Sequence, residues 1–382
     1  MKRILFLTGT RADFGKLKPL IYQLDKSKDF DVHIFVTGMH MLSKYGGTVD
    51  EVRKAGFQNI YTYINQTSAM PMDVILANTI QGLSSYIHEY KPDLIVVHGD
   101  RAEALAGAIT GAMNNVLVAH IEGGEVSGTI DESIRHAISK LAHVHFVANE
   151  LAKKRLIQMG ELADSIFVIG SPDIDIMLSK NLPGLESVRQ RYEIEFDAYG
   201  IFVYHPVTTE LKDLRQNIKT VVNALIKSDK NYVVIYPNND PGSDIILEEI
   251  LPLQHNPRFK IFPSLRFEYY LTILRNCLFT IGNSSVGIRI SEVYGKMAIN
   301  IGNRQKNRHE SVNILNVNEN ETEIQDAIRQ IAVLKPIQAY TFGNGESAKR
   351  FSQIMHAPKI WEIPVQKYFV DAAVEKLLNE KD

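Results

Sequence analysis

The chain has 382 residues, of which 45% are hydrophobic, enough for about two domains with cores of their own. The formal net charge of −2 gives no sign of a nucleic-acid partner or of an anionic membrane surface. The single cysteine, Cys277, excludes an internal disulfide and fits a reducing compartment. No apolar run approaches the roughly 20 residues that a membrane helix needs. We therefore expect a cytoplasmic protein that binds neither membrane nor nucleic acid.

Strand-like apolar runs alternate with helical patterns along almost the whole chain, which predicts parallel sheets covered by helices on both faces. In the first half the predicted strands are 4–8, 32–37, 94–98, 116–121, 143–148 and 166–169. The second half predicts strands at 201–204, 232–236, 259–262, 278–281 and 297–301, and then a helix over 323–333. We expect an α/β protein of two Rossmann-like, doubly wound domains, residues 1–172 and 173–354, with the active site in the interdomain cleft.

The stretch from His120 to His136 follows a predicted buried strand and precedes a predicted helix. Three glycines carry the chain around a corner, and Thr129 with Glu132 has the spacing of a capping box. Glu122 therefore falls at a strand end and Asp131 in the first turn of the helix. Two carboxylates near one spot suggest acid–base chemistry, while the alternative is a solvated loop whose acids only cap the helix.

Ligands of open α/β sheets bind beyond the carboxyl ends of the strands, where this sequence places several polar groups. The loop 282–287 precedes a helix, whose free N–H groups, together with two serine hydroxyls, fit a diphosphate. An ordinary helix cap explains the same residues equally well. Arg11 either pairs with that diphosphate or with an acid such as Asp13. His205 ends a strand and could hydrogen-bond a phosphate or move a proton, although most histidines do neither. The strand ends also carry Asp100, Glu122 and Asn238.

Other site classes fit poorly. Residues 9–15 lack the G-x-G-x-x-G pattern of a dinucleotide site, which argues against a nicotinamide enzyme. His143 and His145 lack the spacing of a metal site, and Asp173 and Asp175 lie at a predicted hinge, so we interpret all four as structural. The acids among the strand-end groups lack the partners of a dedicated Mg²⁺ cage. We expect neither a metal nor a cofactor.

Eight segments together resemble the hydrolysing UDP-N-acetylglucosamine 2-epimerases of bacterial sialic-acid biosynthesis: 8–13, 36–40, 98–101, 122–136, 205–206, 236–240, 282–285 and 302–305. The resemblance covers essentially the whole chain. It implies a GT-B-like fold in which a C-terminal helix, here 355–382, joins the first domain. It also implies a homodimer or homotetramer that converts UDP-GlcNAc and water to N-acetylmannosamine and UDP through a 2-acetamidoglucal intermediate.

By position, the resemblance implies a set of site residues. The catalytic ones are Asp100, Glu122, Asp131 and His205. The substrate-binding ones are Arg11, Arg101, Asn238, Leu265 (through its backbone, to uracil), Gly282, Ser284, Ser285 and Arg304. One position departs from the family, because Ile290 stands where a glutamate usually accepts from the ribose hydroxyls. We therefore expect the ribose to be held in another way, or less tightly.

Three alternatives remain open at the level of the sequence. The first is a hydrolysing 2-epimerase for a UDP-diacetamido-trideoxy sugar, as in legionaminic-acid routes. The second is a GT-B glycosyltransferase, which would keep the UDP loop but need an acceptor site. The third is a non-catalytic UDP-sugar sensor, which would have no use for three acids around one sugar.

Overall fold

The computed structural model describes residues 1–67, 70–306, 309–368 and 370, apart from the side chain of residue 290. The chain divides into two compact units. Unit 1 comprises Met1–Glu125, Asp131–Leu178 and the chain from Phe342 onward, whereas unit 2 comprises Val126–Ile130 and Ser179–Thr341. None of the helices in the described part of the chain is long and apolar enough to cross a membrane.

Unit 1 contains a sheet of seven parallel strands in the order β3-β2-β1-β4-β5-β6-β7. The central strands are nearly continuous apolar runs because both of their faces are covered. The strand bounds are β1 Lys2–Thr8, β2 Phe30–Val36, β3 Asn59–Thr62, β4 Leu94–His98, β5 Leu117–Ile121, β6 Val144–Val147 and β7 Ile166–Val168.

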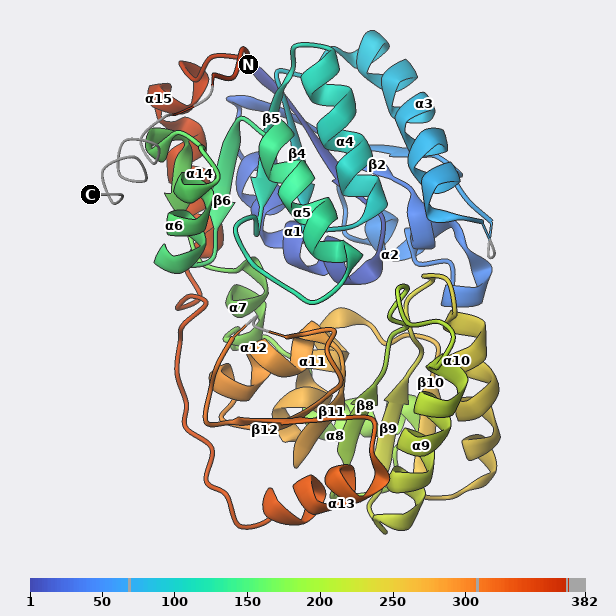
Figure 1. Cartoon of the computed structure of the whole chain (residues 1–382). Coiled ribbons are helices and arrows are strands. Elements are labelled where there is room, and N and C mark those ends of the chain that lie inside the picture. Colours follow the sequence, from blue (N-terminus) through green and yellow to red (C-terminus); the bar gives the residue numbers. More distant parts are fainter. Residues whose placement is uncertain (68–69, 307–308, 369, 371–382) are drawn as a thin grey trace, which may run out of the picture. The chain divides into compact units, whose positions relative to one another are not determined.

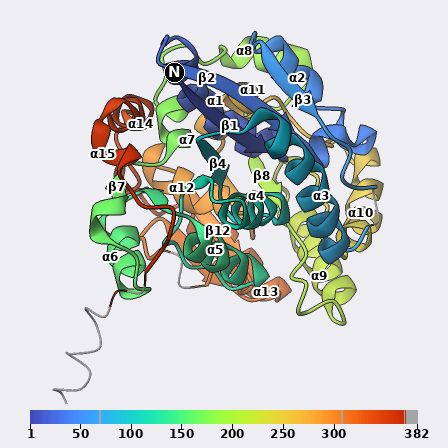
Figure 2. The ribbon, with the colours of Figure 1, turned by 90° about the horizontal axis from the view of Figure 1, so that it is seen from above.

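Helices cover both faces of this sheet (Figures 1 and 2). On one face, α3 (Met72–Tyr90), α4 (Ala102–Met113) and α5 (Ile130–Leu141) bury their apolar sides. On the other face, α1 (Arg11–Asp25) packs beside α14 (Ser347–His356). The remaining helices of the unit are α2 Val49–Lys54, α6 Glu150–Gln158, α7 Pro172–Met177 and α15 Pro358–Trp361.

Unit 2 repeats the plan with six parallel strands in the order β10-β9-β8-β11-β12-β13. Its strands are β8 Gly200–Val203, β9 Tyr232–Ile235, β10 Phe259–Phe262, β11 Phe279–Gly282, β12 Met297–Ile301 and β13 Ile314–Val317. Its helices are α8 Leu185–Tyr192, α9 Leu214–Lys227, α10 Ser243–Ile250, α11 Phe267–Asn276, α12 Ser285–Val293 and α13 Glu321–Gln330. Helices α9, α10 and α13 share one core with the strands.

The predicted fold class is confirmed, since both sheets are parallel and helices alternate with strands. The sequence did not predict two of the strands, β3 and β13. Both lie at sheet edges and have only four residues, of which two in β3 and one in β13 are exposed. Their apolar signal is correspondingly short, because an edge strand is covered less than a central one.

The unit boundaries lie at Leu178/Ser179 and Thr341/Phe342, whereas the sequence suggested 172/173 and 354/355. Hydrogen bonds account for the difference. The Ser171 N–H donates to the Phe342 carbonyl over 2.7 Å, and the Asp175 carboxylate accepts from the N–H groups of Ser347 and Ala348 at the start of α14. The returning helix thus begins at Ser347, earlier than the expected 355, and residues 371–382 lie outside the described residues.

Two fully buried histidines of unit 1 make its stability sensitive to acid. Burial lowers the pKa of His40 to about 4 and that of His120 to about 3. His40 bonds the hydroxyls of Thr8 and Thr48, and the His120 ring lies 2.8 Å from the Gly99 carbonyl. Both are neutral in the fold, whereas the unfolded chain takes up protons below about pH 6.5. Their contribution is present above pH 6.5 and is lost as the pH falls toward 4 and 3.

We therefore expect the free energy of unfolding to fall between pH 6.5 and 4 by up to about 1.4 kcal/mol per pH unit for each histidine. Urea unfolding at several pH values measures this slope. His40→Gln should make it shallower, and the exposed His88→Gln is the matched control. An unchanged slope in His40→Gln would contradict the assignment.

Candidate functional site

Unit 1 brings Asp100 and Glu122 to the same edge of its sheet. His98 of β4 pairs with Ile121 of β5, so that the residues after each strand leave the sheet side by side. The Gly99 N–H donates to the Ile121 carbonyl over 3.0 Å, which fixes this turn. Glu122 has φ +65°, a left-handed conformation that is uncommon for a residue with a side chain. This uncommon backbone conformation therefore fixes the direction in which the Glu122 side chain leaves the chain.

Arg135 interacts with three acidic residues of unit 1. Its guanidinium is buried, bonds the Asp100 carboxylate and donates to the Glu125 carbonyl over 3.1 Å. Burial alone would lower the pKa of Arg135, yet Asp100, Glu125 and Asp131 together raise it above its ordinary value. Asp131 lies four residues before Arg135 on α5, hence on the same helix face. The structure thus groups Asp100 and Asp131 through an arginine to which the sequence analysis gave no role.

We expect Arg135→Met to lower the free energy of unfolding by up to about 3–5 kcal/mol, because the buried Glu125 and the partly exposed Asp100 and Asp131 lose their counter-charge. Urea unfolding measures the loss. The double variant Arg135→Met/Asp100→Asn should recover part of it, since the uncompensated charge is then gone. Wild-type stability in the single variant would show that Arg135 does not hold this group together.

Glu122 lies in a second buried cluster. One of its oxygens, Oε2, is 3.2 Å from the Lys16 Nζ and 3.1 Å from the His98 Nε2. Its other oxygen, Oε1, accepts from the Ser171 hydroxyl. Asp173, which we had interpreted as structural, contacts the same lysine and the same hydroxyl. Sequence reasoning gave no role to Lys16, His98 and Ser171, since they are distant from Glu122 along the chain.

The predicted capping box at α5 is wrong. The Thr129 hydroxyl is buried and makes no hydrogen bond to any residue that the structure describes. Thr129 belongs instead to the short segment of unit 2, in which the Gly128 N–H donates to the Arg304 carbonyl over 3.0 Å. A capping box does form at the start of α1, between Thr10 and Asp13.

The two arginines of unit 1 expected at the nucleotide have acidic neighbours. Arg11 pairs with Glu51 over 2.8 Å, and not with Asp13, which caps α1. Arg101 is the N-cap residue of α4, and its Nε lies 3.5 Å from the buried Glu103 carboxylate. Both arginines lie at carboxyl ends of strands, after β1 and β4 respectively.

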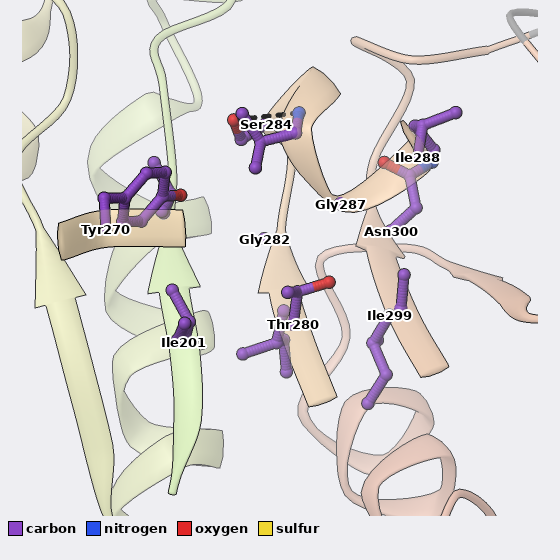
Figure 3. Close-up of a pocket in the computed structure, with 13 residues that line it drawn as sticks. Ile201, Tyr270, Thr280, Gly282, Ser284, Gly287, Ile288, Ile299 and Asn300 are labelled. Carbon is purple, nitrogen blue, oxygen red and sulfur yellow. Dashed lines mark hydrogen bonds between the residues drawn. The ribbon is translucent and has the colours of Figure 1, made fainter. Parts of the chain in front are cut away.

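In unit 2, the loop between β11 and α12 is the segment for which the sequence predicts a phosphate site. Ser284 lies in the loop and Ser285 is the first residue of α12, whose free N–H groups and dipole favour an anion. Gly282 has φ +128°, and a Cβ there would come within 2.0 Å of the Val203 carbonyl, so the turn requires glycine. Beside the loop is a small pocket lined among others by Tyr270, Thr280, Ser284, Gly287 and Asn300 (Figure 3).

His205 is held in a defined orientation and tautomer. Its backbone is clamped by Asn283, whose side chain accepts from the His205 N–H over 2.6 Å and donates to the His205 carbonyl over 2.8 Å. The Asn238 N–H donates to the His205 Nδ1 over 3.0 Å. Because Nδ1 accepts, the proton of the neutral ring is on Nε2, which is therefore a hydrogen-bond donor. The structure thereby brings His205 and the backbone of Asn238 together.

Of the remaining predicted residues of unit 2, Arg304 lies beside this loop, whereas Leu265 follows another strand, β10. Arg304 and Gln305 both donate to the Asn283 carbonyl, over 3.3 and 3.1 Å. Leu265 is buried in the segment that leads from β10 to α11. The side chain of residue 290 lies outside the described residues, so the expectation about the ribose stays untested.

The two histidines interpreted as structural have hydrogen-bond partners in the fold. The Val118 N–H donates to the Nδ1 of His143. The other ring nitrogen of His143, Nε2, lies 2.9 Å from the Val365 carbonyl. His145 lies 3.1 Å from the buried Glu161 carboxylate, and burial lowers its pKa. The described residues include no group of three or more histidine, cysteine, aspartate or glutamate side chains placed to hold a metal.

Comparison with known proteins gives a consistent result. A Neisseria meningitidis UDP-N-acetylglucosamine 2-epimerase is 48% identical over 375 residues, which cover 97% of this chain and 99% of the relative. A Legionella pneumophila UDP-N,N'-diacetylbacillosamine 2-epimerase (hydrolyzing) is 33% identical over 93% of this chain and 96% of its own. The fold matches a Methanocaldococcus jannaschii UDP-GlcNAc 2-epimerase solved with UDP-GlcNAc and UDP, with a TM-score of 0.80 at 23% identity, covering 93% and 99% of the chains. The family profile for UDP-N-acetylglucosamine 2-epimerase matches residues 22–356, and this chain therefore belongs to that family.

Proposed function

We propose that this protein is a hydrolysing UDP-GlcNAc 2-epimerase, which converts UDP-GlcNAc and water to N-acetylmannosamine and UDP at the start of sialic-acid biosynthesis. The 48% identity to the Neisseria enzyme, over nearly the full length of both chains, is the observation that carries the proposal. We further propose that it acts in the cytoplasm as a homodimer or homotetramer.

The chemistry explains why acids and a phosphate site are both needed. The C2 proton of the sugar is not next to a carbonyl, so its direct removal would be slow. If the C1–O bond to UDP breaks first, C1 becomes cation-like and the C2 proton becomes acidic. Loss of that proton gives 2-acetamidoglucal and UDP. A proton then adds to C2 from the opposite face and water adds at C1, which inverts C2 and releases N-acetylmannosamine.

We assign residues described above to the loss of the diphosphate and to the proton transfers at C2. The helix end at Ser284 and Ser285, the Nε2–H of His205 and the arginines Arg11 and Arg304 would stabilise the leaving diphosphate. Of the unit 1 acids, we assign Glu122 and Asp131 to the proton transfers at C2. Asp100, bound to Arg135, would support them. Asn238, Leu265 and Gly282 would shape the nucleotide site, and Arg101 would contact the nucleotide.

The sequence identities to the relatives also favour UDP-GlcNAc over the diacetamido sugar as the substrate. The Legionella protein that acts on the diacetamido sugar is 33% identical, against 48% for the Neisseria protein named for UDP-GlcNAc. The GT-B glycosyltransferase and the sugar sensor remain alternatives of other classes, and neither requires buried acids such as Glu122.

Incubation of the purified protein with UDP-GlcNAc in D₂O, followed by NMR, tests the proposal. We expect N-acetylmannosamine with deuterium at C2, together with free UDP. Turnover of UDP-diacetamidobacillosamine in preference to UDP-GlcNAc would favour the first rival. Transfer of intact GlcNAc to an acceptor would favour a glycosyltransferase, and binding without turnover would favour a sensor.

A further inference from the structure

Four groups of unit 1 close a ring of polar contacts around the Glu122 carboxyl. Lys16 on α1 contacts the Glu122 Oε2 over 3.2 Å and the Asp173 Oδ2 over 3.4 Å. Ser171 contacts the second oxygen of each acid, the Glu122 Oε1 and, over 2.5 Å, the Asp173 Oδ1. Each carboxyl thus has one oxygen at the lysine and the other at the same serine hydroxyl. The Ser171 side chain has no solvent exposure, and the residue exposures of Glu122 and Asp173 are only 4% and 7%.

The hydrogen atoms in this ring can be counted. The Ser171 hydroxyl has one hydrogen, so it can donate to only one of the two carboxyl oxygens that it contacts. The second contact needs a hydrogen of its own, which one of the two carboxyls can supply. Two acids that share one site in this way can hold one proton between them. Lys16 offsets the charge of the carboxylate that remains.

We propose that Ser171 and Asp173 are positioning residues that hold a proton for Glu122. In the reaction proposed above, on which this inference rests, Glu122 exchanges a proton with C2 of the sugar. Asp173 passes its proton to the Ser171 hydroxyl, which passes its own hydrogen to the Glu122 carboxylate, and Glu122 then gives this proton to C2 of the sugar. Both carboxylates are ionised after this step, beside the Lys16 ammonium. A proton that Glu122 later accepts returns to Asp173 by the reverse transfer.

The surroundings of the pair set its charge. The ionisable groups placed against it are Lys16 from α1, His98 from β4 and Asp175 from α7. Asp175 is oriented away from the ring, since its carboxylate accepts from the N–H groups of Ser347 and Ala348 over 2.9 and 2.8 Å. The two aspartates of α7 therefore have different tasks, and Asp175 provides a matched control for Asp173.

The test compares Asp173→Asn with Asp175→Asn. Asparagine keeps the shape at position 173 but cannot hold the proton, so we expect kcat to fall at least about tenfold while the Kd for UDP is unchanged. Loss of the neighbouring negative charge should move the limb of the pH–rate profile that reports Glu122 to lower pH, by about one unit or more. Asp173→Glu should restore part of the activity. Asp175→Asn should lower the melting temperature and leave that limb in place.

A lower melting temperature in Asp173→Asn with an unmoved limb would mean that Asp173 is only structural, and it would overturn the proposal. If Asp173→Asn does not fold, Ser171→Ala tests the same transfer without removing a charge and should move the limb in the same direction. NMR of protein with ¹³C-labelled glutamate carboxyls, assigned with Glu122→Gln, follows the same proton without turnover. A titration of Glu122 that Asp173→Asn does not change would overturn the inference even if UDP-GlcNAc proves not to be the substrate.

Discussion

Asp131→Asn is expected to lower the turnover of UDP-GlcNAc by at least about 100-fold while UDP still binds. The side chain lies in the first turn of α5, on the helix face that carries the buried Arg135. Its carboxylate contributes to the raised pKa of Arg135, which shows that the two groups interact. Asparagine is nearly isosteric and can still form hydrogen bonds, but it cannot exchange a proton with C2. The loss should therefore appear in kcat and not in nucleotide affinity.

The adjacent residue offers a control for this variant. Glu132→Gln removes a negative charge from the same turn, but Glu132 projects about 100° further around the helix and lies 3.5 Å from His136. It should leave kcat close to that of the wild type. Initial rates of N-acetylmannosamine formation and calorimetry with UDP measure both quantities. Near-normal turnover in Asp131→Asn would remove Asp131 from the mechanism.

The sequence was sufficient for the fold because its signals are local. Buried central strands such as β4 and β12 are short apolar runs between helical patterns, and their bounds were predicted to the residue. The edge strands β3 and β13 were missed because exposed residues interrupt their four-residue runs, whereas the edge strands β7 and β10 have no exposed residue. The boundary at Leu178/Ser179 was missed for another reason, since it depends on hydrogen bonds of Asp175 to a helix that begins 172 residues later.

The site shows the same division between local and long-range information. Strand ends identified Asp100, Glu122 and His205, because their position follows from the order of elements along the chain. The partners of these residues did not follow, since Lys16 and Ser171 are separated from Glu122 by 106 and 49 positions. The pair of aspartates at 173 and 175 was noticed and interpreted as structural. The contacts place Asp175 at the start of α14 and Asp173 beside Ser171 in the cluster of Glu122.

The geometry of His205 predicts that it acts as a hydrogen-bond donor and not as a proton shuttle. Its Nδ1 accepts from the Asn238 N–H over 3.0 Å, and the proton of the neutral ring is consequently on Nε2. A general base would need that nitrogen unprotonated, whereas a donor to the leaving diphosphate needs it as it is. Asn283 holds the backbone of His205 at both its N–H and its carbonyl, so the ring is oriented before substrate arrives.

We therefore expect His205→Asn to lower kcat by about 100- to 1,000-fold, the effect of removing one donor from a developing negative charge. The asparagine oxygen can replace Nδ1 as acceptor for the Asn238 N–H, so that this variant removes mainly the Nε2–H. His205→Gln can place its amide N–H near the position of Nε2 but loses the acceptor for the Asn238 N–H, so it should retain more of kcat and bind UDP less tightly. His255→Asn, on the exposed surface of the same unit, should change neither quantity. The pH–rate profile distinguishes a hydrogen-bond donor from a proton shuttle. Removal of a donor lowers the rate at every pH, whereas removal of a proton shuttle also removes one limb of the profile. If His205→Asn abolishes a limb that the wild type has, His205 transfers a proton and the tautomer inferred from Asn238 is not the reactive one.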